Sequence, residues 1–383
     1  MTTSKLPLPG LLALSLAAFI TVLTEALPAG LLPRMAASLD VSEALVGQLV
    51  TAYALGTLLT AIPLTAATRG LRRRPVLLVA IGGFAVVNTV TALSADYALT
   101  LAARFLAGVF AGLLWSLAAG YAARIVAPPL QGRAIAVTMA GIPVALSLGI
   151  PAGTFLGALV GWRAAFGIMS GLTLLLVGWV LAAVPDFPGE GAGRRPGLLR
   201  VLLLPGIRSV LFVTLAYVLA QNILYTYIAP FMALRGLGDR IDLVLLVFGI
   251  AALAGIFLTG ALIDRHLRLL VLASTVLFGL AAVMLGLGGA VVILGAVGLW
   301  GLAYGGVPTL FQTASAKTAG PAADAAQSMI VTVWNIAIAG GGLAGGLVLD
   351  RLGAAALPWV AGAVLLPALL SAWAAKRHGF PGA

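Results

Sequence analysis

Roughly a dozen long apolar stretches run through this chain, and nearly every charged residue lies in the short gaps between them. A stretch of about 18 or more apolar residues with few charges can cross the roughly 30 Å hydrocarbon core of a bilayer as a helix. Only 9% of the 383 residues are charged, whereas a soluble domain carries about 25%. The pattern predicts an all-α membrane protein with twelve transmembrane helices, at 8–33, 44–66, 75–94, 98–121, 133–159, 164–184, 208–233, 242–263, 268–288, 290–314, 325–348 and 355–375.

The distribution of basic residues predicts how these spans are oriented. With Met1 placed in the cytoplasm, sixteen of the 22 Lys and Arg residues fall in cytoplasmic gaps, five fall in outer gaps and Arg104 lies within a span. Lys and Arg are in excess in the cytoplasmic loops of membrane proteins. Both termini are therefore expected in the cytoplasm. The sorted charges form no basic, aromatic-interleaved face, so we expect a lipid bilayer around the chain and no nucleic-acid partner.

The residue types that usually carry chemistry are scarce. The chain has no cysteine, and His266 and His378 lie in loops. No H-E-x-x-H, G-x-S-x-G or P-loop pattern is present. We therefore expect no enzymatic activity, no metal and no cofactor. A membrane enzyme would need a buried catalytic constellation and a sensor would need a soluble effector domain, and the sequence shows neither.

A polar interval rich in Pro and Gly, which begins Pro185-Asp186-Phe187-Pro188-Gly189, separates the sixth apolar stretch from the seventh. It is the longest interval of low hydrophobicity in the chain. It predicts an N-terminal six-helix bundle at 1–184, a cytoplasmic linker at 185–207 and a C-terminal six-helix bundle at 208–383.

The two halves also repeat each other. The loop Thr68-Arg69-Gly70-Leu71-Arg72-Arg73 is matched in the second half by Asp264-Arg265-His266-Leu267-Arg268. Internal repeats are typical of transporters that rock two bundles about a site near the midplane. The alternative is that glycine is simply common in membrane helices. A second match pairs Gly149, Pro151, Gly153 and Gly157 in the fifth span with Gly340, Gly341, Gly342, Gly345 and Gly346 in the eleventh.

Several segments resemble a known family over nearly the whole chain. They are Thr24-Glu25-Ala26-Leu27-Pro28-Ala29-Gly30-Leu31-Leu32-Pro33, Val50-Thr51-Ala52-Tyr53-Ala54-Leu55-Gly56, Arg104-Phe105-Leu106-x-Gly108, Gly161-Trp162-Arg163-x-x-Phe166 and the stretch from Trp334-Asn335 to Gly346. The chain resembles the major facilitator superfamily, in its twelve-helix drug:proton antiporter group and the arabinose- or sugar-efflux-permease-like branch.

This resemblance implies two pseudo-symmetric six-helix bundles and a monomer in the bacterial inner (plasma) membrane. It implies a proton-coupled exporter that works by alternating access. The expected partners are protons and a small organic solute such as a drug or a sugar. A proton-coupled uptake symporter or a purine exporter of the same fold remains an alternative.

The conformational motifs of the family are present with departures. The loop motif G-x-L-x-D-R-x-G-R-R has Thr68 in place of its aspartate, while Arg69, Arg72 and Arg73 remain. The second copy keeps Asp264, Arg265 and Arg268. A contact between the halves is therefore expected at the Asp264 copy. The antiporter motif of the fifth span has Gly149-Ile150-Pro151 in place of its usual glycine–proline pair.

Two formal charges, Glu25 and Arg104, lie well inside predicted spans. A charge at the bilayer centre costs at least about 2.5–3.5 kcal/mol, and such residues usually face a cavity or each other. At 1.5 Å per residue, both lie roughly 10 Å below the outer ends of their spans, so a direct or water-bridged pair is feasible. Glu25 is the expected proton-coupling group, with Arg104 as its partner. The alternative is a static ion pair that locks two helices.

Aromatic and amide side chains at helical spacing predict the substrate site. An apolar site with scattered hydrogen-bonding groups suits a neutral or lipophilic small molecule. The alternatives are interfacial belts for the aromatic rings and interhelical bonds for the amides. The expected set is Trp115 in the fourth span, Tyr217, Gln221, Asn222 and Tyr225 in the seventh, Trp300, Tyr304 and Gln312 in the tenth, and Trp334 and Asn335 in the eleventh.

Overall fold

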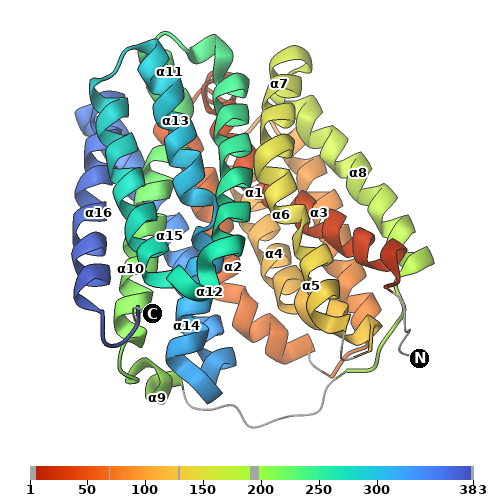
Figure 1. Cartoon of the computed structure of the whole chain (residues 1–383). Coiled ribbons are helices and arrows are strands. Elements are labelled where there is room, and N and C mark those ends of the chain that lie inside the picture. Colours follow the sequence, from red (N-terminus) through yellow and green to blue (C-terminus); the bar gives the residue numbers. More distant parts are fainter. Residues whose placement is uncertain (1–5, 69, 128–129, 190–197, 381–383) are drawn as a thin grey trace. The chain divides into compact units, whose positions relative to one another are not determined.

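Helices make up almost all of the computed structural model over the residues that it describes, which are 6–68, 70–127, 130–189 and 198–380 (Figure 1). The first half contains α1 (Leu8–Leu39), α2 (Glu43–Thr68), α3 (Arg73–Leu93), α4 (Tyr97–Ile125), α5 (Gln131–Met139), α6 (Gly141–Val144), α7 (Ile150–Val160) and α8 (Trp162–Ala183). The second contains α9 (Leu198–Leu202), α10 (Ile207–Thr226), α11 (Ile228–Leu234), α12 (Ile241–Leu287), α13 (Ala290–Gly305), α14 (Val307–Ala319), α15 (Ala323–Leu352) and α16 (Leu357–Ala374).

Within these ranges, twelve helical segments are long and apolar enough to cross a membrane. The expected all-α protein with twelve spans is confirmed. Several spans are less regular than the sequence suggested. The fifth is divided among α5, α6 and α7, with a π-helical turn at Ala145–Gly149. The eighth and ninth form the single helix α12, which bends at the non-helical backbone of His266. The tenth is divided between α13 and α14.

The chain separates into two compact units. The first comprises Met1–Ser42 and Gln48–Gly193, and the second comprises Glu43–Gly47 and Arg194–Ala383. The expected domain limits of 1–184, 185–207 and 208–383 remain a prediction, because the division into units does not define where a linker begins or ends.

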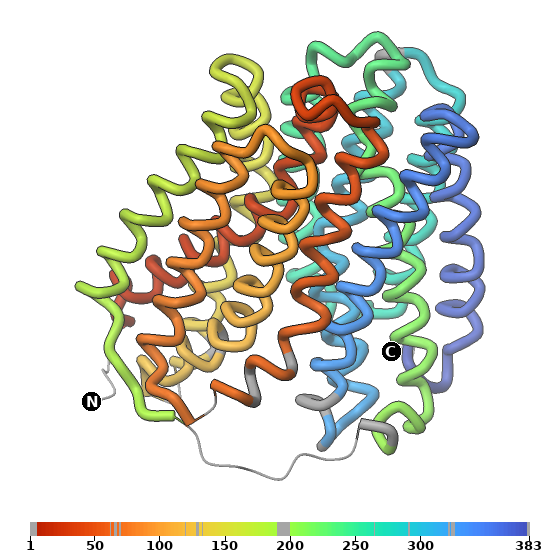
Figure 2. Tube along the Cα trace, turned by 180° about the vertical axis from the view of Figure 1, so that it is seen from behind, coloured from red at the N-terminus to blue at the C-terminus, as the bar shows by residue number. Residues whose placement is uncertain are grey.

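In the first unit, α3 lies between α4 and α8, and α1 packs against α7 and α8 (Figure 2). The interior is apolar and includes Leu14, Ala80, Phe84, Leu114 and Val180. The helices α2 and α4 approach backbone to backbone at Gly108, where an added Cβ would collide with the carbonyl oxygen of Tyr53. Small residues at such crossings allow close helix packing in a membrane, where lipid supplies no hydrophobic drive between helices.

In the second unit, α10 packs against α15 and α16 (Figure 1). The first part of α12 meets α13 just as closely as α2 meets α4, since a Cβ at Gly305 would collide with the carbonyl oxygen of Ala252. The interior of this unit differs in composition from that of the first. It contains large aromatic rings, among them Trp300, Tyr217 and Phe278, which are all almost completely buried.

Candidate functional site

Arg104 is a fully buried charged residue of the first unit. Its helix α4 begins after Asp96, whose carboxylate accepts a hydrogen bond from the backbone N–H of Leu99 at 2.7 Å. Two turns further on, the side chain of Arg104 is 0% exposed. Its guanidinium carbon lies 5.0 Å from the ring centroid of Tyr53 and 6.0 Å from that of Phe166. Cation–π contacts of this kind stabilise a desolvated cation by about 2 kcal/mol.

Glu25 meets Arg104 through its backbone. The Nη2 atom of Arg104 donates to the backbone carbonyl of Glu25 at 3.1 Å. Among the described residues no ion pair joins the Glu25 carboxylate to Arg104, and the Nε and Nη1 atoms of Arg104 have no hydrogen-bond partner. The expected proximity is therefore confirmed, but the atom that Arg104 binds is the peptide oxygen. Two charged donors remain available to an acceptor.

Polar residues that the sequence did not single out surround this pair. Asn88 on α3 is fully buried, and its Nδ2 lies 3.2 Å from the hydroxyl of Thr24. The hydroxyl of Tyr53 donates to the carbonyl of Thr21 at 3.2 Å. Tyr53 and Thr24 lay in segments that carried the family resemblance, which was a usable signal. Nothing in the sequence pointed to Asn88.

The glycine and proline motif of the fifth span faces α1. Added Cβ atoms at Gly149, Gly153 and Gly157 would crowd the side chains of Phe19, Leu27 and Leu31, one helical turn after another. Pro151 is buried among them. Close packing along this line follows from the missing side chains, while the conformational role of these residues remains a prediction.

An aromatic cluster occupies the interior of the second unit. The ring of Trp300 lies 4.8 Å from that of Phe248 and stacks on that of Phe278, with centroids 5.7 Å apart and planes 10° apart. Tyr225 contacts the same indole edge-on at 6.0 Å. The other members are Tyr217, which contacts Phe278 and Phe311, and Tyr304, which contacts Phe248.

Hydrogen bonds fix several polar groups of this cluster, whereas the buried hydroxyl of Tyr225 has no hydrogen-bond partner among the described residues. The indole N–H of Trp300 donates to Oε1 of Gln221 at 2.6 Å. Since an indole N–H can only donate, it selects the amide oxygen, and the two N–H donors of Gln221 must point elsewhere. The hydroxyls of Tyr217 and Ser274 are 2.9 Å apart, and Ser274 also donates to the carbonyl of Ala303 at 2.8 Å.

The structure thus brings together five of the expected substrate-site residues: Tyr217, Gln221, Tyr225, Trp300 and Tyr304. Asn222 and Asn335 are half-buried, and each donates to a carbonyl of its own helix, Val218 and Val331 respectively. Gln312 is exposed and Trp334 is half-buried. Trp115 is half-buried against the core of the first unit. The substrate role of all ten remains a prediction.

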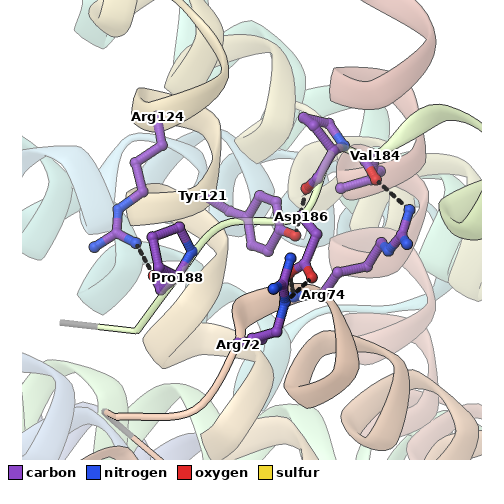
Figure 3. Close-up of polar contacts among 8 residues, drawn as sticks. Arg72, Arg74, Tyr121, Arg124, Val184, Asp186 and Pro188 are labelled. Atoms are coloured by element: carbon purple, nitrogen blue, oxygen red, sulfur yellow. Dashed lines mark hydrogen bonds and ion pairs between the residues drawn. The ribbon is translucent and has the colours of Figure 1, made fainter. Parts of the chain in front are cut away.

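Each copy of the arginine loop motif makes contacts within its own unit. Arg72 forms an ion pair with Asp186 at 2.6 Å (Figure 3). Arg73 is buried and Arg265 is exposed. Arg268 donates to carbonyl oxygens beyond α16 and at its end. Arg69 and the side chain of Asp264 lie outside the described residues, so the expected contact at the Asp264 copy has no structural description.

Asp186 is held ionised by its surroundings. Its carboxylate accepts the backbone N–H of Arg74 at 3.0 Å and the Nε–H of Arg72. These donors hold the pKa of Asp186 below its ordinary value. In the part of the chain that the structure describes, no group of three or more His, Asp or Glu residues is placed to hold a metal ion.

Comparison with known proteins gives a consistent result. A family model described as Major Facilitator Superfamily matches residues 14–339. The purine ribonucleoside efflux pump NepI of Escherichia coli O6:K15:H31 (strain 536 / UPEC) is 31% identical over 353 residues, which cover 90% of this chain and 88% of the relative.

Solved structures match over nearly the full length. The chain is similar to a bacterial homolog of the human lysosomal transporter Spinster in an inward-facing, occupied conformation, with a TM-score of 0.77, 16% identity and 96% coverage of both chains. It is also similar to the human organic anion transporter MFSD10 (TETRAN), with a TM-score of 0.71, 20% identity and coverage of 96% and 100%. At these identities the likeness shows the fold alone.

Proposed function

Because the chain belongs to the Major Facilitator Superfamily, and is therefore a multi-pass secondary transporter of a small-molecule substrate and not an enzyme, we propose that it is a proton-coupled exporter with Glu25 as its coupling group. We place it in the bacterial inner membrane with both termini in the cytoplasm. The sixteen-to-five distribution of basic residues between the two sides supports this orientation.

The observation that carries the proposal is the hydrogen bonding of Arg104. A fully buried guanidinium contacts the peptide oxygen of Glu25 while two of its donor atoms are without partners among the described residues. Such donors attract a carboxylate and have no comparable attraction for a carboxylic acid. Protonation of Glu25 therefore changes the energy of any conformation in which its side chain faces Arg104.

Exchange follows if this change is linked to alternating access. In the state open to the outside Glu25 takes up a proton and loses its attraction to Arg104. In the state open to the cytoplasm it releases the proton, and the restored attraction favours return. A ligand or proton shifts a conformational equilibrium only by its differential affinity for the two states, and Arg104 supplies that difference.

For the substrate we propose a purine ribonucleoside or a solute of similar chemistry. The relative reported above is named for purine ribonucleosides at 31% identity over 90% of this chain. A flat heteroaromatic ring with acceptor atoms suits side chains such as Tyr225 and Tyr304 together with the oriented N–H donors of Gln221. A sugar or a drug, expected from the resemblance of sequence motifs, has no such support among these relatives.

The test is transport in proteoliposomes under an imposed pH gradient. With an acid interior, an antiporter should accumulate labelled inosine, adenosine or guanosine, because protons leave as substrate enters. A symporter would require an acid exterior, so the sign of the gradient separates the two mechanisms. Arabinose and chloramphenicol belong in the same panel as a sugar and a drug.

The matched variants are Glu25→Gln and Glu43→Gln, the second at the start of α2. Glu25→Gln should abolish accumulation driven by the pH gradient and leave exchange down a substrate gradient, while Glu43→Gln should retain both. Accumulation that requires Na⁺ and ignores the pH gradient would contradict proton coupling. Uphill transport by a well-expressed Glu25→Gln protein would remove Glu25 from the mechanism.

A further inference from the structure

The same three residues follow the last long helix of each unit. Phe187-Pro188-Gly189 comes after α8, and Phe380-Pro381-Gly382 comes after α16. Phe187 packs against the core of the first unit, and Phe380 is fully buried in the second. Each phenylalanine therefore anchors the segment after its helix to the interior of its own unit.

In the first unit, each residue of the segment Val184–Pro188 contacts another part of the unit, and Figure 3 shows the contacts of Val184, Asp186 and Pro188. Tyr121 donates its hydroxyl to the carbonyl of Pro185 at 2.8 Å, and its ring meets that of Phe187 edge-on at 5.5 Å. Arg74 and Arg124 make longer contacts with the carbonyls of Val184 and Pro188, at 3.5 Å and 3.4 Å. We call this segment the first strap.

The first strap also caps α3 from outside. The first backbone N–H groups of a helix have no partner within it, and the cap residue Arg72 supplies none from its side chain. The strap supplies two acceptors instead. The carbonyl of Phe187 accepts the N–H of Arg73 at 2.9 Å, and the Asp186 carboxylate accepts that of Arg74 at 3.0 Å. A carboxylate is favourable at this end of the helix dipole.

In the second unit, the segment Ala375–Phe380 folds back in a related way, and we call it the second strap. Nη1 of Arg268 donates to the carbonyl of Phe380 at 3.1 Å, while Nη2 donates to that of Trp373 at 2.7 Å. The hydroxyl of Thr318 donates to the carbonyl of Gly379 at 3.3 Å.

A backbone contact completes the second strap. Gly379 lies against Gly206, at the start of α10, so closely that a Cβ on Gly206 would collide with the backbone of Gly379. Both glycines have positive φ, which residues with side chains rarely adopt. The second strap is therefore held in this position by its backbone contact with Gly206 as well as by Arg268.

We propose that these two straps are matched conformational devices, each joining the end of its unit's last helix to the arginine loop between that unit's second and third spans. The two loops differ in one respect that the straps explain. The second loop has its own carboxylate at Asp264, whereas the first has Thr68 at that position. Asp186, in the first strap, supplies the carboxylate that the first loop lacks.

The straps make the cytoplasmic ends of several helices in a unit move together, as bundles that rock as rigid bodies require. The ion pair between Arg72 and Asp186 is not enough by itself to couple these helices. The side chain of Arg72 is 71% exposed, and exposed ion pairs contribute little because water screens them. The cap of α3 and the carbonyl contacts hold the first strap, and they are independent of which substrate or ion is transported.

The chain contains no cysteine, so single-cysteine probes can measure strap opening in the whole protein. Val76→Cys places a probe in the core of the first unit, one turn along α3 from the capped Arg73, and Val210→Cys places one beside Gly379 of the second strap. Both native side chains are buried. Labelling by a polar maleimide added to the cytoplasmic side of inside-out vesicles reports how often each strap opens.

The expected result is a crossed pattern. Asp186→Asn should raise labelling of the Val76→Cys probe by about fivefold, as expected when a charge-assisted hydrogen bond is replaced by a neutral one to the amide oxygen, without affecting Val210→Cys. Arg268→Gln should do the reverse. Tyr121→Phe removes only the hydroxyl that holds Pro185 and should act on the first probe alone, by a smaller factor. Asp350→Asn, at the end of α15, is the control and should affect neither probe.

Three outcomes would overturn the proposal. The first is unchanged labelling of both probes in Asp186→Asn and Arg268→Gln, which would mean that neither contact holds a strap closed. The second is an equal rise at both probes from either substitution, which would indicate general destabilisation. The third is equal labelling of Asp186→Asn and Asp350→Asn, which would mean that any lost carboxylate acts alike.

Discussion

The interiors of the two units differ in kind. The first surrounds one guanidinium, that of Arg104, which is 0% exposed and has two donor atoms without partners among the described residues. The second surrounds neutral aromatic rings, and hydrogen bonds join some of their polar atoms, as in the pair Trp300–Gln221 and the chain Tyr217–Ser274–Ala303, while the hydroxyl of Tyr225 has no partner among the described residues. The first interior therefore contains a buried formal charge, and the second contains neutral polar groups among aromatic rings.

This difference suggests that the first interior serves proton coupling and the second serves substrate recognition. A buried charge is expensive and is kept where a change of protonation is used. A buried hydrogen-bonded aromatic cluster is rigid and specifies a ligand's shape. We therefore expect substitutions in the first interior to change the pH dependence of transport, and substitutions in the second to change which solutes are transported. Each prediction below tests one side of this separation.

The largest effect is expected from Glu25→Gln. The amide keeps the shape of the side chain but cannot titrate, so accumulation driven by a pH gradient should be lost and the pH profile of the remaining exchange should be flat. The ranking of substrates should not change. Transport assays in proteoliposomes between pH 5 and 8 measure both properties. An altered ranking with an intact pH profile would reverse the assignment of the two interiors.

Arg104→Lys should have the next largest effect. Lysine keeps the charge but loses the planar fork, so it cannot contact the Glu25 carbonyl and stack between Tyr53 and Phe166 in the same way. We expect strongly reduced coupled transport from a folded protein. Arg104→Gln should also reduce the yield of folded protein, because it removes both cation–π contacts and the charged donor to the Glu25 carbonyl. Thermal stability and transport of the two variants separate these effects.

Full activity of Arg104→Lys, with a normal pH profile, would show that any buried cation suffices. The cation–π contacts and the bond to the Glu25 carbonyl would then have no part in coupling.

Trp300→Phe should affect recognition. The smaller ring preserves most of the packing but leaves the oxygen of Gln221 without its donor, at a cost of about 1–3 kcal/mol. If Gln221 contacts substrate, its amide becomes free to turn, and affinity should fall by roughly tenfold for each 1.4 kcal/mol of lost interaction. The measurement is the KM of several nucleosides, with the pH profile as the control. A changed pH profile would place Trp300 in coupling instead.

The sequence predicted the elements of this comparison better than their atomic contacts. The depths of Glu25 and Arg104 in their spans predicted that the two residues meet, and they do. Which acceptor Arg104 binds depends on the rotation of α1 and on the rings of Tyr53 and Phe166, and helical spacing carries no such information. Asn88 had no sequence signal, because an asparagine in an apolar span can as easily bond its own helix.

The second unit shows the same limit. Spacing placed Tyr217, Gln221 and Tyr225 on one face of α10, but Phe248 and Phe278 come from α12 and look like ordinary core residues in sequence. The expected single span at 133–159 is broken by a π-helical turn between Pro143 and Pro151. A proline lacks an N–H and clashes with the preceding turn, so a bend was predictable, whereas its form was not.

The smallest effect should come from the hydrogen-bond chain at the base of the aromatic cluster, and its direction is specific. Ser274 donates its single hydroxyl proton to the carbonyl of Ala303, so Tyr217 must be the donor in the Tyr217–Ser274 bond. Tyr217→Phe removes that donor and leaves Ser274 bonded, at a cost of about 0.5–1.5 kcal/mol of stability. Ser274→Ala instead strands the buried phenol and the carbonyl together and should destabilise more. Neither should change the pH profile, since neither alters the surroundings of Glu25, and any change in transport should be a small shift in substrate ranking, because Tyr217 belongs to the aromatic cluster of the second unit. Thermal unfolding in detergent gives the order of stability, and proteoliposome assays give the other two properties.

If Tyr217→Phe proved more destabilising than Ser274→Ala, the direction of the hydrogen-bond chain would be wrong. If either variant shifted the pH profile, the second interior would share in coupling, and the separation between the two units would fail.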